Sequence, residues 1–121
     1  AAGLIAIGAR LADADPRARR WIAIGARHLE GCVLDQFERD GWYLQHSFNY
    51  LRVALDGLVS GQRALRVVGS TLGSEALARA RSGIDLLAEV CDPVSGEPPL
   101  HGANCSAARG TPARQKHSHI K

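Results

Sequence analysis

The amino-acid sequence predicts an all-α protein of about four to five helices, followed by a disordered basic C-terminal tail. Apolar residues recur every three or four positions along most of the chain, which is the spacing of one helix face. Clusters of Gly, Pro, Asp and Ser interrupt this pattern, and no segment of useful length alternates with the period of two typical of a strand. A chain of 121 residues with 45% hydrophobic content suffices for one small domain.

The first two predicted helices are separated by an Asp-Ala-Asp-Pro segment. The first covers residues 2–12, with apolar positions at Leu4, Ile5, Ile7 and Leu11. Asp15 followed by Pro16 is typical of an N-cap and a first helical residue, so the second helix is expected from about Pro16 to Arg39. Its core-facing stripe advances by three or four residues at each step: Ile22, Ala26, Leu29, Val33 and Phe37.

Ser47 is expected to cap a third helix, after the break at Asp40-Gly41. Gly57 and Gly61 weaken the end of this helix, so a separate short helix is predicted at residues 62–68. The apolar stripe of the third helix is Tyr50 or Leu51, Ala54 or Leu55, then Leu58.

Ser74 is the expected cap of the last helix, and the Pro- and Gly-rich residues 92–99 form the turn that ends it. The apolar register of this helix is Leu77, Ala80, Ile84, Leu87 and Cys91.

The net charge of +3 originates in the C-terminal tail. Four basic residues and no acidic one lie in the last thirteen positions: Arg109, Arg114, Lys116 and Lys121. Residues 1–108 hold eleven basic against twelve acidic side chains, a net charge of −1. Without a basic stripe or a recognised motif, no specific nucleic-acid binding is expected. Charged residues and glycines interrupt every long apolar run, so no membrane span is expected either.

An abrupt change of composition at Cys105 predicts a helical domain at residues 1–104 and a disordered basic tail at 105–121. From this position on, small, basic and His residues replace the amphipathic pattern. A reading-frame shift or a truncation before Cys105 would produce such a change.

Cysteine and histidine spacing predicts neither a disulfide framework nor a metal site. Three cysteines without Cys-x-x-Cys spacing allow one pair at most. Cys32 and Cys91 fall on apolar helical faces and are expected to be small buried side chains. His101 and the His-x-His pair at His117 and His119 do not form a placed ligand set, so no metal or other cofactor is expected.

Residues 40–52, DGWYLQHSFNYLR, are the most suggestive of a binding site, with four of the six aromatic residues of the chain. Trp42 and Tyr43 offer flat surfaces for a sugar ring. Three polar side chains among these rings can hydrogen-bond sugar hydroxyls or a carboxylate: Gln45, His46 and Asn49. The alternative is that the rings fill a small helical core and the polar side chains are solvated.

Tyr50 is the candidate acid or base within this stretch. A tyrosine serves in that role when neighbouring groups lower its pKa from about 10 toward the working pH. If the third helix included His46, the two side chains would be four residues apart and would share one face.

The same stretch resembles the Asp-Gly-x-x-x-Gln/Glu-x-Ser-x-x-Tyr segment of the heparinase II/III-like polysaccharide lyases. The flanking segments agree with this resemblance: AAGLIAIGARLA at the start, RRWIAIGARHLEGCVLDQF at 19–37, and DPVSGEPPLHGAN at 92–104. The likeness covers roughly residues 1–104. It implies part of an (α/α) toroid, a ring of helical hairpins whose inner helices line a cleft for acidic polysaccharide.

The resemblance also implies β-elimination on uronic-acid-containing chains. A proton leaves the carbon beside the uronate carboxylate, and the glycosidic oxygen departs from the next carbon. Tyr50 matches the family's acid/base Tyr through its spacing from Ser47, and Gln45 matches the Gln/Glu position. His46, Asn49 and Trp42 are the further candidates for lining the cleft. A periplasmic or secreted location is implied as well.

Departures from the family pattern predict that this chain is inactive alone. Leu51 stands where the family usually has His, and Cys105 where Asp is expected after Asn104. The Asn-Asn-His segment expected before the first helix, and the β-sandwich expected after the toroid, do not occur in this sequence.

The alternative function is a small all-α interaction module without catalytic activity. An open arc of helices would leave apolar edges exposed, and such patches bind partners or self-associate. The expected partner is thus an acidic polysaccharide in the first interpretation, and another protein or a second copy in the alternative.

Overall fold

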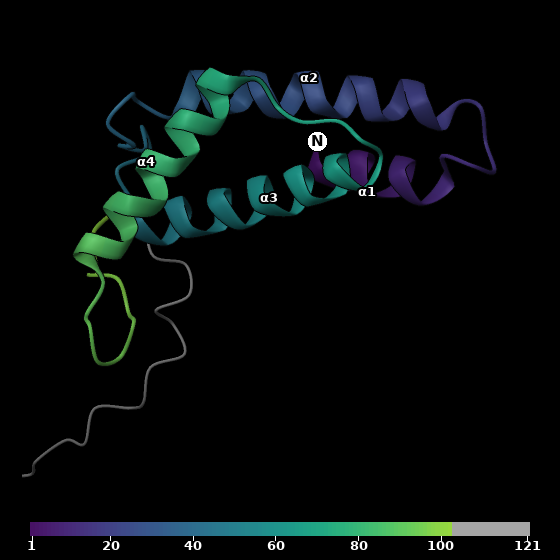
Figure 1. Ribbon diagram of the computed structural model, residues 1–121. Coiled ribbons are helices and arrows are strands. Elements are labelled where there is room, and N and C mark those ends of the chain that lie inside the picture. Colours follow the sequence, from purple (N-terminus) through teal and green to yellow (C-terminus); the bar gives the residue numbers. More distant parts are fainter. Residues whose placement is uncertain (103–121) are drawn as a thin grey trace, which may run out of the picture.

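The computed structural model describes residues 1–102, and the regular structure in this range is helical (Figure 1). It comprises α1 (Ala2–Leu11), α2 (Ala18–Gln36), α3 (Phe48–Val67) and α4 (Ser74–Val90). α1 and α3 run antiparallel to α2, and α4 passes obliquely across α2 and α3. The predicted all-α class is confirmed. The toroid remains a prediction, because four helices do not define a ring, and the predicted tail at 105–121 lies outside the described residues.

A repeated sequence explains the packing of α1 on α2. The residues Ile-Ala-Ile-Gly-Ala-Arg occur once in each helix, beginning at Ile5 and at Ile22. Ile5 packs against Gly25 and Ile22 packs against Gly8, so each copy fills the space left by the glycine of the other. A Cβ on either glycine would lie 2.7 Å from the Cγ1 atom of the facing isoleucine. The hairpin therefore requires both glycines for the close approach of its helices.

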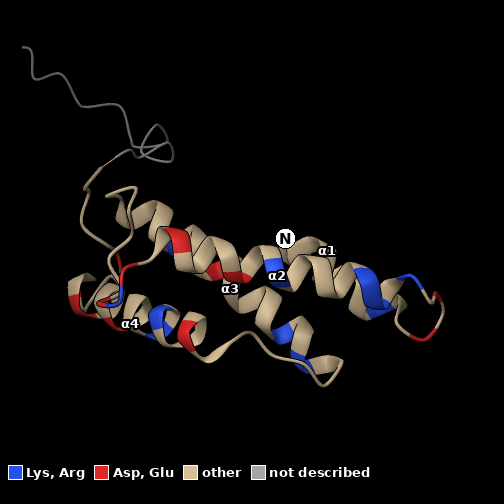
Figure 2. Ribbon diagram, turned by 90° about the horizontal axis from the view of Figure 1, so that it is seen from above, with Lys and Arg blue, Asp and Glu red and all other residues tan. Residues whose placement is uncertain are grey.

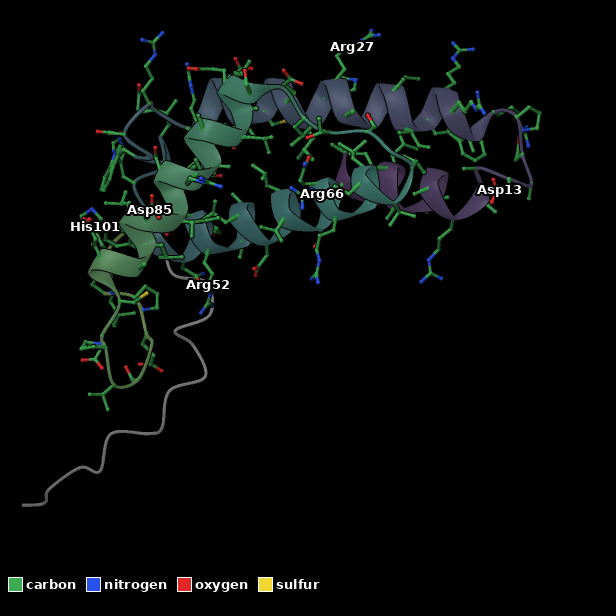
Figure 3. The ribbon with its side chains drawn as sticks, viewed as in Figure 1. Asp13, Arg27, Arg52, Arg66, Asp85 and His101 are labelled. Carbon is green, nitrogen blue, oxygen red and sulfur yellow. The ribbon has the colours of Figure 1, made fainter. Side chains whose placement is uncertain are left out.

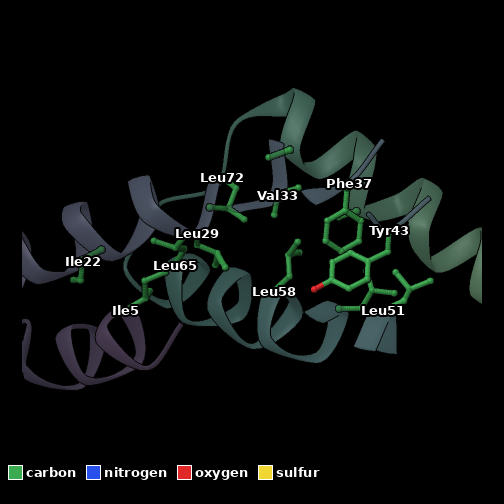
Figure 4. Close-up of a cluster of buried hydrophobic side chains, with 13 residues drawn as sticks. Ile5, Ile22, Leu29, Val33, Phe37, Tyr43, Leu51, Leu58, Leu65 and Leu72 are labelled. Atoms are coloured by element: carbon green, nitrogen blue, oxygen red, sulfur yellow. The ribbon is translucent and has the colours of Figure 1, made fainter. Parts of the chain in front are cut away.

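One hydrophobic core joins all four helices (Figure 4). Gly61 brings α3 close to α2, since a Cβ at this position would lie 2.5 Å from Cδ2 of Leu29. The predicted stripe of α2 supplies a large part of the core. The buried cluster consists of Ile5, Ile22, Leu29, Val33, Phe37, Tyr43, Leu51, Leu55, Leu58, Leu65, Leu72, Ala76 and Ala80.

Charged side chains hold α4 against α2 by satisfying backbone groups at two helix ends. The guanidinium of Arg79 donates to the carbonyl oxygens of Leu34 and Phe37, both at 2.8 Å. In the opposite direction, the carboxylate of Glu30 accepts from the backbone N–H of Gly73 at 3.2 Å, at the start of α4. Arg79 of α4 thus places a positive charge at the C-terminal end of α2, and Glu30 of α2 places a negative charge at the N-terminal end of α4. Each charge has the sign that stabilises the helix end it contacts.

α3 is one continuous helix through Val67, so the separate helix predicted at 62–68 is wrong. The helix continues past Gly61 because that glycine is buried in the contact with Leu29, and this tertiary contact outweighs its low helix propensity. Gln62 then holds the following linker, since its Oε1 accepts from Leu72 N–H at 3.0 Å and its Nε2 donates to Thr71 Oγ1 at 2.7 Å.

Several predicted burial positions are corrected by the structure. Cys32 is exposed and Cys91 is half-buried, because the core faces of α2 and α4 are turned away from them.

The core register of α4 also differs from the prediction. Ile84, expected in that register, is 45% exposed. Small residues form the buried face of α4 instead: Ala76, Ala80 and Gly83. A Cβ on Gly83 would lie 3.2 Å from the Phe37 ring, so the small face admits that ring.

Gly8→Ala is expected to lower the free energy of unfolding by about 1–3 kcal/mol, because the added methyl overpacks the contact with Ile22. Gly31→Ala is the matched control, since a Cβ there has no atom within 4 Å and helix propensity alone predicts about 1 kcal/mol of stabilisation. Urea denaturation measures both. Equal effects of the same sign would contradict the packing argument.

Arg79→Met is expected to destabilise the fold by about 1.5–3 kcal/mol, because two carbonyl oxygens lose a charged donor. Arg81→Met, at an exposed position on the same helix, should change stability by less than about 0.5 kcal/mol. Thermal unfolding followed by circular dichroism compares the two. Similar melting temperatures for both variants would exclude the capping role.

Candidate functional site

The loop between α2 and α3 is folded back on itself and fixed against α4. Phe37 and Tyr43 form an isolated antiparallel bridge, and Glu38 N–H donates to the Trp42 carbonyl at 2.9 Å. Gly41 has a φ of +89°, and a Cβ there would collide with the backbone of Ser82 and Gly83. The loop is therefore positioned by a contact that only glycine allows at this point.

Tyr43 belongs to the core rather than to an exposed wall. Its side chain is 6% exposed, its ring centroid lies 5.2 Å from that of Phe37, and its hydroxyl donates to Gln36 Oε1 at 3.1 Å. The predicted flat surface formed by Trp42 and Tyr43 is therefore wrong for Tyr43, because alternation across the bridge turns its ring inward.

An aromatic cluster, defined here as Trp42, His46, Phe48 and His101, forms the outer side of the loop. Trp42 Nε1–H donates to His46 Nδ1 at 2.9 Å. The Trp42 ring meets Phe48 edge-on, with centroids 5.9 Å apart and planes at 90°. His101 completes the cluster at 6.5 Å from Trp42 and 5.9 Å from Phe48. Trp42 is half-buried and both histidines are exposed, so the cluster presents rings and imidazole nitrogens at the surface.

His46 lies outside α3, which begins at Phe48. The premise that His46 and Tyr50 share one helical face is therefore wrong. His46 has a φ of +51°, a conformation that costs a non-glycine residue energy, and Ser47 then caps the helix as predicted, accepting from Tyr50 N–H at 3.3 Å. Gly102 packs against the carbonyl of His46, which brings His101 to the cluster.

Tyr50 opens onto a different surface, a groove of about 340 Å³ among α1, α2 and α3. The side chain is half-buried, and Tyr43, Gln36 and Cys32 also line this groove. The groove is otherwise mostly apolar. Tyr50 and the aromatic cluster thus lie on two neighbouring surfaces around the start of α3.

The remaining predicted residues occupy separate environments. Gln45 is exposed on the loop. Asn49 is half-buried and its Oδ1 accepts from Arg52 Nη2 at 3.1 Å. Sequence reasoning did not select Arg52, nor His101 for this cluster. His101 and Trp42 are far apart along the chain, so no local sequence pattern indicates that they are in contact.

Residues 1–102 contain no group of three or more His, Cys, Asp or Glu side chains arranged to hold a metal ion. Within the same range, no helix combines the length and apolar character required to cross a membrane. His117 and His119 lie outside the described residues.

The burial of Tyr43 predicts that the folded state loses stability at alkaline pH. Burial, and to a smaller extent the charge of a Cys32 thiolate, raises the pKa of Tyr43 above its usual value of about 10. The folded state therefore favours the neutral phenol, and this contribution is complete below pH of about 10 and is lost as pH rises through the folded pKa.

The Tyr43→Phe variant tests this dependence. Its free energy of unfolding should fall less steeply than that of the wild type between pH of about 9 and 11, although the lost hydrogen bond to Gln36 lowers its stability at neutral pH. Parallel pH curves for the two proteins would show that Tyr43 does not titrate differently on unfolding.

No protein-family model matches this chain, and comparisons with curated proteins and with solved structures return no match either.

Proposed function

We propose that this chain is a helical segment of a heparinase II/III-like lyase, and that its aromatic cluster binds uronic-acid-containing polysaccharide. The observation that carries the proposal is the hydrogen-bonded pair of Trp42 and His46 at the surface, beside the cap that positions Tyr50.

The chemistry of the cluster suits an acidic sugar. The apolar face of a sugar ring packs on an aromatic ring, and Trp42 is held in place by its bond to His46. Because Nδ1 of His46 accepts that bond, the neutral imidazole carries its proton on Nε2, which can donate to a hydroxyl or carboxylate. The positive φ of His46 also supports the proposal, since strained residues concentrate at functional sites.

Tyr50 is the acid/base residue of the proposed β-elimination. Tyr50 takes the proton from the carbon beside the carboxylate, and the electron pair left behind forms a double bond to the next carbon as the C–O bond there breaks. The leaving oxygen takes up the proton from Tyr50, which gives a hydroxyl group on one product and an unsaturated uronate on the other. The carboxylate charge must be neutralised as the carbanion develops, and Asn49, next to Tyr50 in the first turn of α3, is the candidate donor from this segment. Leu51 stands where the family usually has His, so we expect this chain by itself to bind the polysaccharide without turnover.

The two tryptophans provide the binding test. Trp42→Ala is expected to weaken binding of heparin or polygalacturonate by about tenfold, because the sugar loses its stacking surface. Trp21→Ala is the control, since Trp21 lies in α2 under the Arg17 guanidinium and not in the cluster. Isothermal titration calorimetry measures both, with dextran as a neutral polymer. Absence of binding by the wild type, or equal losses in both variants, would refute the proposal.

Tyr50→Phe separates binding from chemistry. The variant should retain polysaccharide affinity within about twofold, because the hydroxyl acts on the transition state rather than on the bound sugar. In a longer protein that includes this segment and forms unsaturated uronate, the same change should abolish the product, measured by ultraviolet absorbance. Product at the wild-type rate would remove Tyr50 from the reaction.

A further inference from the structure

A second groove, of about 920 Å³, lies between α3 and α4 and shares no residue with the aromatic cluster. Its floor is apolar: Leu58 and Ala80 are buried, and Leu77 is half-buried. Val59 on one wall and Ile84 on the other are 40% and 45% exposed. The small buried face of α4 produces this groove, because it lets α4 approach the core while its larger side chains remain outside.

Three arginines line the same groove, and none of them forms an ion pair within residues 1–102. Arg63 and Arg66 come from α3, and Arg81 comes from α4. Every ion pair among residues 1–102 involves Asp15 or Glu75, at other places in the fold. One acidic side chain, Asp85, also lines the groove, so its walls carry a net charge of +2. Figure 2 shows basic positions on both α3 and α4, and Figure 3 labels Arg66 on α3 and Asp85 on α4.

We propose that this groove binds an amphipathic helix of a partner protein, with an apolar stripe flanked by acidic side chains. The stripe would cover Leu77 and Ile84, and the flanking carboxylates would pair with the three arginines. The groove extends along α4 from Ser74 to Asp85, about 17 Å at the rise of an α-helix, which accommodates about three turns of a partner helix.

The lining favours this occupant over the others. No aromatic residue is present among the described lining residues, so neither sugar rings nor nucleic-acid bases find a stacking surface. The chain's own residues after Glu97 include no acidic side chain, so that segment does not complement the arginines. The proposal is independent of polysaccharide binding at Trp42.

A labelled peptide of about 18 residues, long enough for the groove, serves as the probe, with Leu at every third or fourth position and Glu on both flanks. Fluorescence anisotropy with the full chain should show saturable binding. A peptide with Lys in place of Glu, and one with Ser in place of Leu, should each bind at least tenfold more weakly. Equal binding of either control peptide would overturn the proposal.

Substitutions in the protein test whether the peptide binds in the groove between α3 and α4. Arg63→Glu with Arg66→Glu should weaken binding by about tenfold or more, and Ile84→Ser should also weaken it. Arg10→Glu with Arg27→Glu is the matched control, because it makes the same charge change at exposed positions outside the groove. Circular dichroism establishes that each variant is folded.

Three results would overturn the assignment. The first is an equal loss of peptide binding in the control variant. The second is a dimer in sedimentation experiments that Ile84→Ser dissociates, which would make the groove an interface between copies. The third is stronger binding of heparin than of the peptide at the groove arginines, shown by its loss in the Arg63→Glu/Arg66→Glu variant.

Discussion

The close approach of α1, α2 and α3 at three glycines is the constraint on which the rest of the structure depends. Gly8 and Gly25 let α1 and α2 exchange isoleucine side chains, and Gly61 admits Leu29 between α2 and α3. A methyl group at any of these positions would separate two helices and open the shared core. The candidate site lies beyond these contacts, at the loop that joins the end of α2 to the start of α3.

α4 is attached to this three-helix unit in a different way. Its contact face is made of small residues, and Arg79 and Glu30 satisfy backbone groups at the ends of α2 and α4. Such hydrogen bonds are directional, so they fix the position of α4 without covering much apolar surface. This arrangement produces both the groove beside Ile84 and the close contact of Gly41 with the backbone of α4.

The candidate site was predictable in its local parts. Ser47 and the start of α3 follow from cap chemistry. The inward ring of Tyr43, the left-handed backbone of His46 and the arrival of His101 were not predictable, because each depends on a bridge, a turn or a glycine contact formed only in the folded chain.

The sequence by itself determined the all-α class, the approximate position of the long helices and the core stripe of α2, because these follow from the spacing of apolar residues and from the breaks in it, which act within a few residues. Tertiary structure decided the continuity of α3, the buried face of α4 and the exposure of Cys32 and Ile84. These outcomes depend on which neighbour each face meets, and a helix with apolar residues on more than one side does not specify that neighbour from its own pattern.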